Sequence, residues 1–330
     1  MNSEEKAVIE NTSTTLTAES VLCHVTKVCQ SKQSRGWGFP WLVGAAVLAI
    51  PMLSAMAIAQ TNQLTPSVGV EQDTTRVILA DRINRWEYRY LDNLLTRDEK
   101  LEHDTILLGQ RFRATGKLKI DGALPTTLDA WSQYDVAIIG DLTPEEFPVQ
   151  SQEALVEFVK EKGGVAILIA GRSGMPHVFE DNPLQSLLPV KKSDSVVKAD
   201  KYHVGVNRLA ANLQAFQLHD QRERSEELWQ KVFEVQPITW LSEYSTLRPS
   251  ARRLMDAVPI DDTGEPVDLG EKETPVWVCW QQVGAGRVVY LSAPDTYRLR
   301  YQRGDALYNR FWDQILLWVT SDDPGNEKNN

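Results

Sequence analysis

Cysteine is scarce in this chain, with three among 330 residues. Cys23 and Cys29 precede a long apolar run, which leaves Cys279 as the one cysteine in the rest of the sequence. A single thiol cannot build an internal disulfide framework, and the spacing of the first two, without a second pair of ligands, does not fit a zinc site. We interpret Cys23 and Cys29 as reduced cytoplasmic thiols or as part of a discarded leader.

Histidine is rare as well. The five histidines are scattered over positions 24, 103, 177, 203 and 219, without an H-x-x-x-H pattern or clustered acids around them. We therefore predict no metal site, and no motif in the sequence indicates a cofactor.

The chain also lacks an excess of basic charge, because its formal net charge is −10. Residues 1–60 hold four acidic and four basic side chains, so the whole acidic excess lies beyond them. A domain this acidic has no basic face for a phosphate backbone, which excludes nucleic acid as a partner. A hydrophobic content of 42% and a charged content of 24% are ordinary for a globular protein and argue against wholesale disorder.

One long apolar run is present. Trp37 to Ala59 comprises 23 consecutive residues without a charge. As a helix it would be roughly 34 Å long, enough to cross a hydrocarbon core of ~30 Å. Lys27, Lys32 and Arg35 precede it, which predicts a cytoplasmic N-terminus. We expect a single-pass inner-membrane protein of a bacterial cell envelope, with a polar cytoplasmic leader (1–36), a transmembrane segment (37–59), a linker (60–74) and a domain outside the cytoplasm.

Cleavage of this segment is the alternative. Residues 55–57 and 57–59 both have the A-x-A pattern of a signal-peptide cleavage site, and cleavage before Gln60 would release a secreted, periplasmic domain. The leader and the apolar run are both long for a signal peptide, whose apolar core has ~7–15 residues, which favours a retained signal anchor. The compartment of the domain is the same in both cases.

The sequence beyond the linker alternates between strand and helix patterns. Short apolar runs predict strands, and apolar residues at helical spacing between them predict helices. Repeated units of this kind indicate a three-layer α/β fold, with a mostly parallel sheet covered by helices on both faces. The predicted strands are 76–80, 105–108, 135–140 and 165–170, and the predicted helices are 84–97 and 149–162.

The predicted domain spans 75–320, and its C-terminal part is less regular than the rest. We interpret 190–270 as an irregular insert or an extension of the sheet, with a charged helix near 222–232. Residues 276–282 and 287–292 flank Gly284-Ala285-Gly286 and predict a hairpin, whose glycines form a turn rather than a phosphate loop because no helix follows. A last helix over 305–319 should pack on the sheet, and 321–330 reads as a disordered tail.

Four segments, taken in order, resemble a known family. Together they are similar to the class I glutamine amidotransferase-like domain found in large bacterial membrane proteins, and the similarity is weak across 190–270. The resemblance implies a flavodoxin-like fold, in agreement with the alternating pattern. The segments are RVILADRINRWEYRYLDNLL (76–95), YDVAIIGDL (134–142), ALVEFVKEKGGVAILIAG (154–171) and VGAGRVVYLSAPDTYRLRY…FWDQILLWV (283–319).

The catalytic triad that the resemblance implies is missing. Amidotransferases of this fold carry a nucleophilic cysteine on the turn after a central strand, but residues 171–174 read Gly-Arg-Ser-Gly. Where the histidine is expected, residues 293–295 read Ala-Pro-Asp. Cys279 lies inside a predicted strand and is interpreted as a small core residue. Ser173 and His177 form a weak nucleophile–base pair without a carboxylate to orient it, and we expect no catalytic residue.

Charged and aromatic residues follow several predicted strands. Because ligands bind at the carboxyl ends of parallel strands, these residues are the candidate ligand-binding site. They are interpreted either as an ion-pair network that orients the helices or as a pocket for a small anionic ligand, with Arg85, Arg172 and Arg298 as forks for carboxylate or phosphate. Trp229, Trp240, Trp312 and Trp318 are assigned to the core or to an interface. The candidate residues are Asp81, Arg85, Trp86, Glu87, Asp141, Arg172, Ser173, Asp295 and Arg298.

The leading functional hypothesis is a non-catalytic, envelope-anchored domain that binds a ligand or a protein partner. The alternative is a hydrolase or amidase with a non-standard site, using carboxylates such as Glu87, Asp141 or Asp295 at the same strand ends. A third possibility is that 190–270 forms the surface for another envelope protein.

Overall fold

The structure, a computed structural model, describes residues 74–109, 123–193, 199–270 and 273–321. The predicted leader, the apolar segment 37–59, nearly all of the linker and nearly all of the predicted tail lie outside these residues. Among the residues described, no helix is both long and apolar enough to cross a membrane.

An eight-stranded sheet forms the centre of the described domain, in the order β2-β1-β3-β4-β10-β9-β8-β6. The first five strands are parallel to one another, and the last three continue the sheet in antiparallel fashion. With β10 as the fifth strand, the parallel part has the 2-1-3-4-5 order of flavodoxin-like sheets. Its strands are β1 (Thr75–Asp81), β2 (Leu101–Leu107), β3 (Val136–Ile139), β4 (Val165–Ile169) and β10 (Gly286–Leu291).

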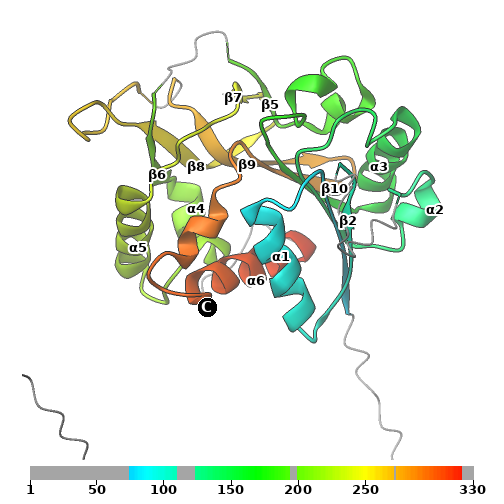
Figure 1. The fold of residues 1–330 in the computed structure, drawn as a ribbon, viewed down its shortest axis with the longest axis horizontal. Helices are drawn as coiled ribbons and strands as arrows, with labels where there is room; N and C mark the ends of the chain where they lie inside the picture. Colours follow the sequence, from blue (N-terminus) through cyan, green and yellow to red (C-terminus); the bar gives the residue numbers. More distant parts are fainter. Residues whose placement is uncertain (1–73, 110–122, 194–198, 271–272, 322–330) are drawn as a thin grey trace, which may run out of the picture. The chain divides into compact units, whose positions relative to one another are not determined.

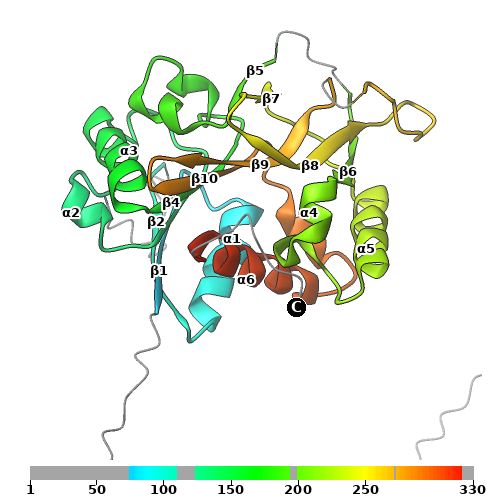
Figure 2. The same ribbon diagram turned by 180° about the vertical axis from the view of Figure 1, so that it is seen from behind.

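Helices cover both faces of the sheet, as the alternating pattern predicted (Figures 1 and 2). The side chains of β1 alternate between the two layers, because Val77 and Leu79 join one hydrophobic cluster while Ile78 and Ala80 join the other. The first layer contains α1 (Trp86–Arg97), α4 (Arg208–Asn212), α5 (Arg222–Val235), α6 (Ala306–Thr320) and the 3₁₀ helices η3 (Gln214–Phe216) and η4 (Thr296–Arg300). The second contains α2 (Leu128–Trp131), α3 (Val149–Lys162), η1 (His177–Phe179) and η2 (Pro183–Leu187).

Most of the predicted elements of the parallel part form close to their predicted bounds. α3 coincides with the predicted 149–162 helix and ends at Gly163, whose φ of 75° is the left-handed conformation that glycine adopts without strain. The predicted strand 105–108 is wrong in its bounds, because β2 spans Leu101–Leu107. β2 is an edge strand with charged residues on its exposed side, so it lacks the continuous apolar run of a central strand.

The region 190–270 is largely regular, which corrects its interpretation as an irregular insert. β6 (Tyr202–Val206) and β8 (Arg252–Pro259) extend the main sheet beyond β9 (Val276–Val283). β5 (Val190–Lys192) and β7 (Tyr244–Leu247) form a separate two-stranded sheet. The alternative interpretation, a sheet extension, therefore holds for β6 and β8.

The predicted hairpin is formed by β9 and β10, and its turn is a packing element. The Ala285 N–H donates to the Lys160 carbonyl, at 2.8 Å, near the carboxyl end of α3. A Cβ on Gly286 would lie 2.2 Å from the carbonyl oxygen of Gly164, so a side chain there would force the hairpin away from the helix. The turn has a structural role, in agreement with the sequence analysis.

Candidate functional site

The carboxyl ends of β1, β3, β4 and β10 meet at one edge of the sheet, and Asp81, the last residue of β1, lies at the base of this edge. Its carboxylate accepts hydrogen bonds from the Arg82 N–H at 2.7 Å and the Asp141 N–H at 3.1 Å, and it binds the Arg85 Nε at 2.6 Å. Burial raises the pKa of Asp81, and the neighbouring Arg85 opposes that rise. Asp81 thereby joins the loops that follow β1 and β3.

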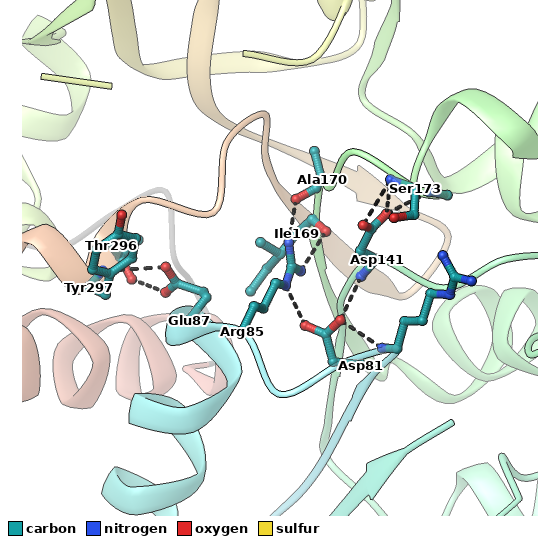
Figure 3. Close-up of polar contacts among 11 residues, drawn as sticks. Asp81, Arg85, Glu87, Asp141, Ile169, Ala170, Ser173, Thr296 and Tyr297 are labelled. Carbon is teal, nitrogen blue, oxygen red and sulfur yellow. Dashed lines mark hydrogen bonds and ion pairs between the residues drawn. The ribbon is translucent and has the colours of Figure 1, made fainter. Parts of the chain in front are cut away.

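Arg85 lies between Asp81 and the end of β4 (Figure 3). Besides its ion pair with Asp81, it donates from Nη1 to the Ala170 carbonyl at 2.9 Å and from Nη2 to the Ile169 carbonyl at 3.4 Å. Of the two interpretations of Arg85, these contacts favour the ion-pair network over the fork for an anion. Its guanidinium connects two strand ends, and its ion pair with Asp81 follows the structural interpretation.

Two glycines allow these loops to approach each other. A Cβ on Gly140 would lie 2.2 Å from the Asp81 Oδ2. A Cβ on Gly171 would lie 2.0 Å from the Asp141 Cγ. Both distances are far inside van der Waals contact, so the buried carboxylates can occupy these positions only beside glycine.

Asp141 and Ser173 are part of the same support. The Asp141 carboxylate accepts from the backbone N–H groups of Ser173, at 2.9 Å, and Gly174, at 2.6 Å, and so fixes the loop after β4. Ser173 contributes its backbone N–H to this contact, and the residue is exposed. Among the described contacts there is no hydrogen bond between Ser173 and His177, so the structure does not assemble them as a nucleophile and base.

Glu87 is buried in the first turn of α1 and connects that helix to η4. Its carboxylate accepts from the Thr296 hydroxyl and, at 3.3 Å, from the Tyr297 N–H (Figure 3). The Trp312 indole donates to the same hydroxyl at 2.9 Å, which extends the network to α6. Burial raises the pKa of Glu87 to about 7, while the hydrogen bonds and Arg85 act in the opposite direction.

Asp295 follows β10 and pairs with Arg298 in the next turn. Burial raises the pKa of Asp295, and the positive charges of Arg298, Arg172 and Arg85 limit that rise. The Arg298 guanidinium also lies over the Tyr297 ring, 5.3 Å from its centre. As with Asp81 and Arg85, a buried carboxylate is held by an arginine a few residues along the chain.

Six of the nine predicted residues line one cavity of about 200 Å³ at this edge. Four further residues, Thr239, Trp240, Pro294 and Tyr297, complete its wall. Trp240 is partly buried and packs against the second hydrophobic cluster, while the Arg172 guanidinium lies over its ring at 5.3 Å, so this tryptophan belongs to both the core and the cavity wall. Trp229, Trp312 and Trp318 are buried core residues, as predicted. The six predicted residues are Arg85, Trp86, Glu87, Arg172, Asp295 and Arg298.

Arg172 differs from the other two arginines of the cavity. It is exposed, and the described part of the chain offers it no ion pair with a carboxylate. Asp81, Asp141 and Ser173, the remaining predicted residues, do not line the cavity and act behind it as supports. The nine predicted residues therefore form two groups: six line the cavity, and three hold the loops around it in place.

Larger cavities of about 550, 760 and 900 Å³ lie elsewhere on the domain. The largest opens at the amino ends of the parallel strands, beside Arg76, Asp135 and Val165. We favour the small cavity, because it lies at the carboxyl ends of the strands and is lined by buried carboxylates with raised pKa values.

The site contains no thiol. Cys279 is fully buried within β9 opposite Tyr290, and burial raises its pKa, so the thiolate needed for nucleophilic attack is disfavoured. The described residues contain no group of three or more histidine, cysteine, aspartate or glutamate side chains placed to hold a metal ion.

No protein-family model matches the chain, and no curated protein matches it. Among solved structures, it is similar to a ThuA-like protein from Bacteroides uniformis, with 12% identity over 78% of this chain and 96% of that one and a TM-score of 0.41. A glutamine amidotransferase from Thermotoga maritima has 14% identity over 76% and 92% of the two chains, with a TM-score of 0.35.

An exo-β-1,4-mannosidase from Opitutaceae bacterium strain TAV5 has 14% identity and a TM-score of 0.38; the match covers 74% of this chain and 36% of the mannosidase. These likenesses are weak, and the assignment of the fold rests on the strand order and the layers. The chain contains a mixed α/β domain with a large sheet whose parallel part has flavodoxin-like strand order.

Proposed function

We propose that the described domain is a non-catalytic binding module with an amidotransferase-like fold, and that it binds a small anionic ligand in the 200 Å³ cavity at the strand ends. One observation carries the proposal: Arg172 presents a guanidinium at this cavity without a carboxylate partner among the described residues. A guanidinium in that state favours a carboxylate or a phosphate group, to which it can donate two parallel hydrogen bonds.

The state of the carboxylates supports binding over catalysis. Asp81 and Asp295 are each paired with an arginine, and both oxygens of Glu87 accept hydrogen bonds from η4. A general base or a nucleophile needs a lone pair directed at the substrate. The turn after β4, where the resemblance implies a cysteine, contains Ser173 in an exposed position without a base.

The proposal places this module at the cell envelope, with the apolar segment 37–59 as its membrane anchor and a protein partner in the envelope as a further possibility. The support is the uncharged run of 23 residues preceded by basic residues. Protease treatment of spheroplasts carrying the full chain should degrade the domain and leave the leader. N-terminal sequencing of the mature protein should begin near residue 1, whereas a start at Gln60 would establish cleavage.

Thermal unfolding of the purified full chain tests anion binding. Acetate or sulfate should raise the melting temperature of the wild type in a concentration-dependent way, because a ligand that binds only the folded state stabilises it. Arg172→Gln should reduce that rise. Arg224→Gln, which changes an exposed arginine on α5 away from the cavity, is the matched control and subtracts the general salting effect of sulfate. Equal behaviour of the two variants would refute the proposal.

A hydrolase remains the second candidate, because one observation favours it: a buried Glu87 with a pKa of about 7 lines the cavity. It predicts turnover of small amide or ester substrates by the full chain and loss of that turnover in Glu87→Gln. A preparation that turns over no such substrate, or activity that survives in Glu87→Gln, would count against this candidate.

A further inference from the structure

The donors that the cavity offers to a ligand are few. Arg85 already donates to Asp81 and to two backbone carbonyls. Arg298 uses its Nε for Asp295, so its two terminal nitrogens remain. Arg172 has no carboxylate partner among the described residues. A ligand would therefore be held mainly by Arg172 and Arg298.

The charged residues that line the cavity balance one negative charge at most. The pairs Arg85–Asp81 and Arg298–Asp295 are each neutral, which leaves the positive charge of Arg172. Glu87 adds between zero and one negative charge, because its pKa is about 7. A singly charged anion is compensated when Glu87 is protonated, whereas a doubly charged one would leave a charge unpaired in a partly desolvated site.

Apart from Thr239, the rest of the wall is mostly apolar. Trp86, Trp240 and Tyr297 present aromatic surface, and Pro294 adds a short aliphatic one. Trp86 is 53% exposed, an unusual state for a tryptophan in a folded domain. A bare inorganic anion would leave these surfaces in contact with water, while a carbon chain would cover them.

The first turn of α1 and the volume of the cavity also bear on the charge and size of the ligand. α1 begins beside the cavity. Its first N–H groups donate to no side chain of the N-cap residue, Arg85, so the positive end of the helix dipole has no side-chain cap, although Glu87 places a carboxyl group in the first turn. The cavity has a volume of about 200 Å³, which favours a small ligand.

We propose that the cavity selects a small monocarboxylate with an apolar body of a few carbons, whose carboxylate binds Arg172 and Arg298 and whose body covers the tryptophan walls. This inference rests on the proposed function, because it names the class of anion that the same site takes. It excludes tetrahedral dianions and neutral analogues as preferred ligands.

Ligand-observed NMR titrations of the full chain in lipid nanodiscs at pH 6 test it with 3-methylbutanoate, its neutral amide and acetate. Sulfate, which is doubly charged at this pH and carries no proton, is the fourth probe, and its binding is read from its displacement of 3-methylbutanoate. 3-Methylbutanoate should bind at least about tenfold tighter than acetate, because three further carbons enter the cavity. It should also exceed its amide and sulfate. For each probe, the quantity compared is the difference in binding between the wild type and Arg172→Gln. Partition into the lipid is the same for both proteins and is therefore subtracted.

Two exposed positions provide a matched pair for the apolar wall. Trp86→Ala should weaken 3-methylbutanoate but leave acetate unchanged, since acetate has no body to cover the ring. Val235→Ala, on α5, also truncates an exposed apolar side chain and should change neither. Because both side chains are more than half exposed, the variants test binding without threatening the core.

The outcomes separate the two proposals. If sulfate shows the strongest Arg172-dependent binding, the monocarboxylate inference fails but anion binding is supported. If the amide equals 3-methylbutanoate, the inference also fails, and anion binding then holds only if sulfate binds in an Arg172-dependent way. If no probe depends on Arg172, both proposals fail. Weaker 3-methylbutanoate binding in Arg172→Gln and Trp86→Ala, with Val235→Ala unchanged, supports both.

Discussion

Replacement of Arg85 by methionine should destabilise the domain strongly. The change removes the ion pair with Asp81, whose side chain is 3% exposed, and the two hydrogen bonds to the carbonyls at the end of β4. Removing one partner of a buried ion pair typically costs about 3–5 kcal/mol, because the other charge remains buried without compensation. For a domain of this size, such a loss lowers the melting temperature by roughly 6–20 °C.

The chain contains a matched control for this experiment. Arg222 and Glu226 on α5 have the same four-residue separation, but their side chains are 48% and 43% exposed. Arg222→Met should therefore cost only about 0.3–0.5 kcal/mol. Urea unfolding of the two variants, followed by far-UV circular dichroism, compares one kind of pair in two environments. If Arg85→Met costs no more than Arg222→Met, the role assigned to Arg85 is wrong.

Two further measurements identify the cause of the loss. Asp81→Asn combined with Arg85→Met should cost less than Arg85→Met alone, because the uncompensated charge is gone. The loss should also shrink on acidification. Burial raises the pKa of Asp81 in the folded state, and removal of Arg85 raises it further, so the folded variant takes up a proton more readily than the unfolded chain as the pH falls. A loss that is the same at pH 5 and pH 8 would contradict this explanation.

Three other predictions concern the same edge of the sheet. In parallel urea titrations, Glu87→Gln should be more stable relative to the wild type at pH 8 than at pH 5. The folded-state pKa of Glu87 is about 7, so the wild type loses stability as the pH rises from about 4.5 to 7. The titratable or charged groups around Glu87 are Arg85, Asp295, Tyr297 and Tyr308. Gly171→Ala should cost about 1–3 kcal/mol in thermal unfolding, since the new methyl group would overlap Asp141, and an unchanged melting temperature would show that the loop has room. Ser173→Ala should change stability by less than about 0.5 kcal/mol, since only its backbone N–H binds Asp141, while Asp141→Ala should cost clearly more; equal costs would give the hydroxyl an unrecognised role.

The sequence predicted the parallel part of the fold well, because central strands such as β3 are apolar on both faces and helices such as α3 end at a recognisable glycine. It failed where burial is mixed: β2 and β8 carry charged residues, and their strand character depends on pairing with neighbours far along the chain.

The candidate site was predicted only in part, for a similar reason. The strand-end rule located Arg85, Arg172 and Arg298, but it could not tell a saturated guanidinium from a free one. Arg85 binds carbonyls 84 and 85 residues away, and that contact exists only in the folded sheet. Trp240 was missed because no local pattern distinguishes a tryptophan that lines a cavity from one that fills a core.

The hairpin turn at 284–286 also bears on how the protein can be engineered. A fluorescent reporter or an affinity tag inserted there would have to displace Lys160 and Gly164 at the end of α3. The loop between β8 and β9 offers the opposite situation around Gly264, which is exposed and where an added side-chain atom meets nothing within 4 Å. Gly264 itself has a φ of 87°, which disfavours a side chain, so labels for single-molecule or in-cell studies belong beside it in this loop.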